Sequence, residues 1–259
     1  MKRTNLAKEV SSMCLSIRDA KISSNENVIS ALISMFNKFE NPLLACEIYK
    51  ERIVELLFLL DYLNEDHVDR DVVNEVKSSC ERLMHLFDAP NLNKVFNNIS
   101  KSIIRDIDVA RLRAVSSEMN RVFPIFVLKE DDVSKILADF EEFYSDYMRD
   151  GELNEFVKYS ISNGLERLRF CLNYYEFFGS SSVIDSIYII HKDLYISKGS
   201  SVYCSGDSRI KRLEELMTET IKKIISLDSG FDRVSSLYGK IIMLTQAYDA
   251  VMKCLPPPS

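Results

Sequence analysis

The clearest concentration of reactive side chains in this sequence is a run of carboxylates between residues 130 and 155. This stretch holds ten Asp and Glu residues against Lys135 and Arg149, whereas residues 1–129 hold 18 acidic and 18 basic residues. Clustered carboxylates attract basic protein surfaces, and at suitable spacing they coordinate cations. The local acidity therefore marks this segment as the first candidate for a binding function.

The spacing of apolar residues predicts that the acidic segment is an amphipathic helix. These residues recur at steps of three and four, at Val133, Leu137, Phe140, Tyr144 and Tyr147. A separate face then carries Asp139, Glu142, Asp146 and Asp150. Like charges at this spacing cost about 0.2–0.5 kcal/mol per pair, and acids near the C-terminal end of a helix also oppose its dipole. A stripe of acids that costs stability suggests a function.

Three interpretations of this stripe remain open from the residues alone. It is a solvated face that aids solubility, a docking surface for a basic protein, or a cation site. For the cation site, Asp146, Asp150 and Gly151 match positions one, five and six of an EF-hand loop, but Met148 and Val157 occupy the third and twelfth positions, where ligands are needed. For the docking surface, aromatic residues of the helix would add apolar contact beside the acids.

We adopt the docking interpretation as the leading hypothesis. The protein is then a non-enzymatic interaction module, such as an inhibitor, an antitoxin-like protein or an adaptor, whose partner is a basic protein. The predicted partner-binding residues are Asp139, Glu142, Phe143, Asp146, Tyr147 and Asp150.

The chain shows no recognisable catalytic set, and we expect neither a cofactor nor a metal. Its seven glycines are isolated, so no Walker or Rossmann phosphate loop is present. The alternative hypothesis is a helical enzyme or nucleic-acid-processing factor whose site is assembled from distant residues. Its first candidates would be Glu65, Asp66 and His67, together with the aromatic cluster Tyr174, Tyr175, Phe177 and Phe178.

Nucleic-acid binding is not expected from the distribution of charge. The best basic surface would combine Lys94, Lys101 and Arg105 with Arg111 and Arg113. Asp106 and Asp108 interrupt this surface, and the sequence pI of about 5.3 removes the long-range attraction for phosphates.

The elements that must position these residues are predicted to be helices. The first 150 residues contain no glycine, which disfavours tight hairpins that need positive φ. We therefore predict an all-α bundle of about nine or ten helices, including a first helix from Leu6 to Ile17 and one long helix from Asn91 toward Pro124. Pro124 is the expected boundary between an N-terminal helical unit, 1–124, and a C-terminal bundle, 125–259, which could pack as one domain.

The C-terminal part carries the most regular pattern. Apolar steps of three and four on both sides of Asp228-Ser229-Gly230 predict an antiparallel helical hairpin over 208–255, a surface through which the chain could also self-associate. The stretch 186–206 is ambiguous, because its β-branched and aromatic residues suit either a small β-hairpin or a helix followed by an irregular loop.

Cysteine usage and hydropathy predict a cytoplasmic protein without membrane segments. The six cysteines lie 32 to 91 residues apart with no CxxC pair, which is typical of free thiols in a reducing compartment. No apolar run approaches the roughly 20 residues needed to cross a bilayer, and the first residues lack the apolar core of a secretory signal.

Overall fold

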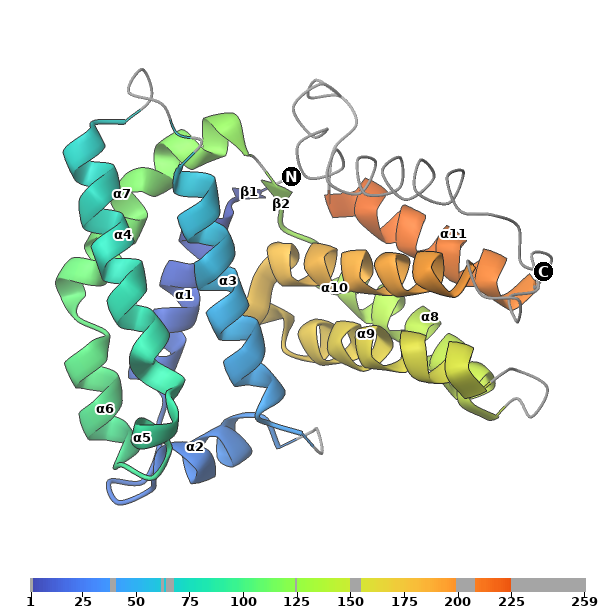
Figure 1. Cartoon of the computed structure of the whole chain (residues 1–259), viewed down its shortest axis with the longest axis horizontal. Helices are drawn as coiled ribbons and strands as arrows, with labels where there is room; N and C mark the ends of the chain where they lie inside the picture. Colours follow the sequence, from blue (N-terminus) through green and yellow to red (C-terminus); the bar gives the residue numbers. More distant parts are fainter. Residues whose placement is uncertain are drawn as a thin grey trace, which may run out of the picture. The chain divides into compact units, whose positions relative to one another are not determined.

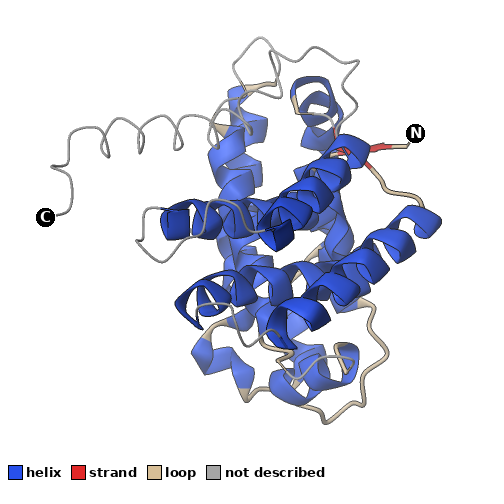
Figure 2. Cartoon of the chain, turned by 90° about the vertical axis from the view of Figure 1, so that its right-hand side faces the viewer, coloured by secondary structure: helices blue, strands red, loops and turns tan. Residues whose placement is uncertain are grey.

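The computed structural model describes residues 2–37, 41–61, 63, 68–123, 125–149, 155–198 and 208–224. These residues are helical nearly throughout, as Figure 2 shows, and the prediction of an all-α fold is confirmed. Within the described residues, none of the helices is long and apolar enough to cross a membrane.

The described elements comprise eleven α-helices, one short 3-10 helix and two very short strands (Figure 1). In chain order they are β1 (Arg3–Thr4), α1 (Leu6–Arg18), α2 (Val28–Met35), α3 (Leu44–Leu60), α4 (Arg70–Met84), η1 (His85–Phe87), α5 (Ala89–Leu92), α6 (Phe96–Ile103), α7 (Asp106–Val122), β2 (Ile125–Phe126), α8 (Glu130–Arg149), α9 (Glu155–Asn173), α10 (Tyr175–Lys198) and α11 (Ser208–Ile224).

The chain divides into two compact units. Unit 1 comprises Met1–Val127 and Asn173–Ser182, and unit 2 comprises Leu128–Leu172 and the chain from Val183 onward. The ten residues at 173–182 join unit 1 although they lie far along the sequence from its other residues, which the sequence pattern did not predict. Pro124, the expected boundary, lies outside the described residues.

Unit 1 is built around α1, which packs against α3 and α7, while α4 packs against α3 and α7 in turn (Figure 1). The helix α1 forms where predicted, because Val10, Met13 and Ile17 are spaced for one face and are almost completely buried. Its N-cap is Asn5, whose side chain accepts a hydrogen bond from the Lys8 amide and donates to Ser116 on α7. The cap therefore also joins two helices.

The single long helix predicted after Asn91 is wrong. The chain instead forms α5, α6 and α7, and it leaves helical geometry at Ile104 and Arg105. The break is stabilised by Asp108, whose carboxylate accepts a hydrogen bond from the Arg105 amide at 3.3 Å and so caps the start of α7. Acids in the first turn of a helix favour a new helix start at this point.

A two-residue antiparallel pairing of β1 with β2 was not predicted either. Arg3 lies opposite Phe126 and Thr4 opposite Ile125. Strands this short have no periodicity to detect, so only the tertiary structure reveals them.

Unit 2 contains α8, α9, α11 and the part of α10 from Val183 onward, and α11 packs on α8. The chain is helical through Lys198, so the β-hairpin alternative is wrong for 186–198, while residues 199–207 lie outside the described part. The first arm of the predicted hairpin is confirmed as α11, with Leu213, Met217 and Ile224 buried. The second arm lies outside the described residues.

Candidate functional site

The acidic helix α8 forms over Glu130–Arg149, as predicted, and it exposes part of the predicted stripe. Glu142 and Asp146 keep 64% and 62% of their side-chain areas exposed, while Asp139 is half-buried. Asp150 lies outside the described residues. The helix itself carries seven acids against Lys135 and Arg149.

The two aromatic residues predicted to touch a partner are in the core of unit 2. Phe143 and Tyr147 are buried and stack on each other with ring centroids 5.4 Å apart. The buried face of α8 passes through Ile136 and Phe140 to these two rings, one residue out of step with Val133, Leu137 and Tyr144, which are only half-buried. Both sets fit a helical repeat, and spacing alone could not decide between them. Neither ring can contact a partner in this conformation.

Three acids of α8 already face cations of the same chain on α11. Arg212 Nη2 lies 3.1 Å from Glu142 Oε2, and Arg212 Nη1 lies 3.8 Å from Asp146 Oδ2. Eleven residues along α11, Lys223 Nζ lies 3.0 Å from Asp132 Oδ1. Since eleven residues make about three turns, the two cations fall on one face of α11. This basic face lowers the cost of placing the acids together.

The opposite flank of α8 is closed by α9. Arg169 Nη2 lies 2.7 Å from Glu141 Oε2, and the Arg169 guanidinium carbon lies 4.1 Å from the centre of the Tyr144 ring. The Tyr144 hydroxyl donates to Glu166 at 3.2 Å. Partial burial, followed by the charge of Glu166, raises the pKa of Tyr144 above its usual value, so the phenol remains a neutral donor. The flank with Glu142 and Asp146 is thus the more open one.

A second group of polar residues, which the sequence did not single out, surrounds Glu9 in unit 1. Its carboxylate is buried and accepts hydrogen bonds from the amides of Ser180 at 3.0 Å and Ser181 at 2.9 Å. The Ser181 hydroxyl also donates to it. These amides open the helical run that follows Gly179, where a negative charge is stabilised by unpaired N–H groups.

Gly179 makes this arrangement sterically possible. Its φ is 74° and its ψ is −174°, a conformation that is essentially restricted to glycine. A Cβ atom added there would lie 2.4 Å from Glu9 Cδ. The signal available in the sequence was the Gly-Ser-Ser-Ser run at 179–182, which is typical of a helix start, but nothing identified Glu9 as its partner.

The electrostatics of Glu9 set two large effects against each other. Burial raises its pKa to about 7, although the hydrogen bonds from Ser181 and Ser180 and the positive charge of Arg52 act to lower it. The carboxyl group of Glu9 therefore titrates near neutral pH. Because it is enclosed in the core and holds the start of a helix, we interpret it as a structural group.

The remaining candidate groups are possible metal ligands, the cysteines and the histidines. Where the structure describes them, their surroundings indicate structural roles. No set of three or more His, Cys, Asp or Glu side chains is arranged to hold a metal within the described part of the chain. Burial raises the pKa values of Cys14 and Cys80 to about 12, which keeps these thiols protonated and unreactive. His85 is exposed beside Asp88, and His67 lies outside the described residues.

The aromatic cluster at 174–178 packs in unit 1 around a single ring. Tyr174 and Phe177 meet Phe36 edge to face with centroids 5.0 and 5.2 Å apart, and Phe178 stacks on it at 5.8 Å. Phe36 and Phe178 are buried. The cluster therefore contributes to the core of unit 1.

No protein family, curated protein or solved structure matches this chain.

Proposed function

We propose that this chain is a cytoplasmic, non-enzymatic interaction module that docks a basic protein on the open flank of α8. The observation that carries this proposal is the exposure of Glu142 and Asp146 beside each other, although Arg212 lies within reach of both. Carboxylates that are more than half exposed still interact with an approaching cation, and their charge speeds its encounter. The free cysteines of the described residues accord with a reducing compartment.

The contacts with α11 support a basic helical surface as the one that would fit this flank. Arg212 bridges Glu142 and Asp146, and Lys223 reaches Asp132, so the acids are spaced for the cations of a helix. Arg212 is itself 44% exposed, and an ion pair of this kind contributes only about 0–1 kcal/mol. A partner with a denser basic surface would therefore compete for the same carboxylates at little cost. Because Phe143 and Tyr147 are buried, we leave them out of the docking surface.

The proposal is tested by neutralising the flank and following what co-purifies from the native cell. The triple variant Asp139→Asn, Glu142→Gln and Asp146→Asn removes three charges with little change in shape. The basic partner should be lost from this variant, while circular dichroism shows unchanged helix content. A matched control is Glu81→Gln, which removes an exposed acid of α4 in unit 1 and should retain the partner. Retention of the same partner by the triple variant at unchanged amount would count against the proposal.

A further inference from the structure

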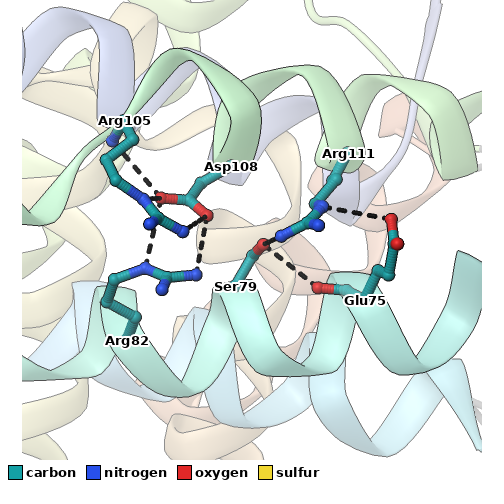
Figure 3. A network of polar contacts seen from close by, with 6 residues as sticks. All are labelled: Glu75, Ser79, Arg82, Arg105, Asp108 and Arg111. Carbon is teal, nitrogen blue, oxygen red and sulfur yellow. Dashed lines mark hydrogen bonds and ion pairs between the residues drawn. The ribbon is translucent and has the colours of Figure 1, made fainter.

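A buried carboxylate between α4 and α7 holds two arginines side by side at the surface of unit 1 (Figure 3). Asp108 Oδ1 accepts from Arg82 Nη2 at 2.9 Å and from Arg105 Nη2 at 3.2 Å. Asp108 Oδ2 accepts from Arg82 Nε at 3.3 Å and from Arg105 Nε at 3.1 Å. One carboxylate therefore receives both guanidinium groups in the two-pronged geometry that suits them.

This arrangement leaves hydrogen-bond donors unused. A guanidinium has five N–H groups, and each arginine directs only its Nε and Nη2 edge to Asp108. Among the residues that the structure describes, none accepts a hydrogen bond from Nη1 of Arg82 or Arg105. The two side chains are 31% and 44% exposed, so both reach the surface of unit 1.

The two arginines are also held in place. Asp108 is fully buried at the start of α7, where it also accepts from the Arg105 amide. Burial opposes its charged form, but the hydrogen bonds from Arg105 and Arg82 outweigh this effect and hold the pKa of Asp108 below its usual value. The carboxylate thus stays ionised at neutral pH. Two like charges that would otherwise separate are kept together, with a net charge of one positive unit for the three groups.

We propose that Arg82 and Arg105 form a binding site for a compact phosphate group, either free phosphate or a phosphate monoester. Guanidinium edges match phosphate oxygens in shape and in number of donors, and the net positive charge of the three groups attracts a phosphate anion. Since Asp108 fixes both side chains before the ligand arrives, less conformational entropy is lost on binding than with free arginines.

The surroundings favour a compact ligand over a long polyanion. Asp106, next to Arg105 in sequence, is 95% exposed and forms an ion pair with Arg18. A third arginine near this pair, Arg111, forms an ion pair with exposed Glu75. Its Nε lies 3.2 Å from Glu75 Oε2. A nucleic-acid backbone that followed α7 would meet both acids, whereas a single phosphate at Arg82 and Arg105 would avoid them.

The test is calorimetric titration of the full chain with inorganic phosphate, and separately with glycerol phosphate, at constant ionic strength. Both ligands should bind saturably at one site, and tighter binding of glycerol phosphate would identify a monoester as the ligand. Arg105→Gln removes one of the two guanidinium groups and keeps the ion pair between Arg82 and Asp108. It should weaken phosphate binding by at least about tenfold. Arg105→Lys keeps the charge without the guanidinium group and should also weaken it.

The control is Arg121→Gln, on the same helix, which removes a 71% exposed arginine paired with Glu118. This variant should bind phosphate as the wild type does. Urea unfolding of each variant shows whether the fold persists. The proposal is overturned if the wild type shows no saturable binding, or if Arg121→Gln weakens binding as much as Arg105→Gln. It is equally overturned if a short single-stranded RNA binds more tightly than both phosphates in an Arg105-dependent way.

Discussion

Glu9→Gln should change how the stability of this protein depends on pH. The pKa of Glu9 is about 7 in the folded chain against 4.5 as the reference value. The folded state therefore binds the proton more tightly than the unfolded state does. The stability that this group contributes is fully present below pH 4.5 and is lost as the pH rises through 7. At about 1.4 kcal/mol per pKa unit, the loss amounts to about 3 kcal/mol.

The variant supplies the reference, because glutamine does not titrate. It also loses one acceptor for the donors of Ser180 and Ser181, which costs about 1–3 kcal/mol at every pH. Asp88 and Asp108 have lowered pKa values, so the stability that they contribute to the fold increases as the pH rises. This increase occurs in both the wild type and the variant. The difference between wild type and variant therefore isolates Glu9.

The assay is urea unfolding monitored by circular dichroism at four pH values between 4.5 and 7.5. We expect the free energy of unfolding of the wild type to fall relative to that of Glu9→Gln by about 3 kcal/mol across this range. Glu81→Gln, an exposed residue of α4, controls for the loss of one carboxylate from unit 1. A difference that stays constant, or one that grows in favour of the wild type with pH, would refute the reasoning. Either result would mean that the hydrogen bonds from Ser180 and Ser181 balance or outweigh the effect of burial on the pKa of Glu9.

Two further substitutions test the packing. Gly179→Ala should lower the free energy of unfolding by about 2–4 kcal/mol, since alanine is strained at this φ and its Cβ meets Glu9. Urea unfolding checks this, and a loss that stays the same in a Glu9→Ala background would argue against the steric cause. Phe140→Ala should cost unit 2 about 3–5 kcal/mol, because the ring is fully buried. A thermal scan that shows no change would contradict its place in the core.

Helix positions were predicted well where the apolar repeat was long and its ends carried clear signals. The first helix is an example, because Leu6, Val10 and Met13 share one face and Asn5 is a good N-cap residue. The same reasoning failed after Asn91. The apolar repeat continues across Ile104 and Arg105, although the helix breaks there and the Asp108 side chain caps the next helix. Asp108, three residues after Arg105, could have indicated that start, but its other partner Arg82 lies 26 residues away and could not be inferred from spacing.

The candidate sites were predictable only in part. Local composition located the acids of α8, because their charge is independent of tertiary structure. It did not identify Arg212, which the chain brings to Glu142 from 70 residues away. Glu9 and Ser181 are separated by 172 residues, so their contact depends on the tertiary fold. Contacts of this kind leave no periodic signal in a single sequence.

The proposed docking of a basic partner on the open flank of α8 competes with the contacts that α11 makes there. It is tested most directly by the dissociation constant of the captured partner for the variant Arg212→Gln, measured by titration against the wild type. Removing the internal cation should tighten binding severalfold at low salt, while costing less than about 1 kcal/mol of stability because the ion pair is exposed. Unchanged or weaker binding of the partner by Arg212→Gln would contradict the claim.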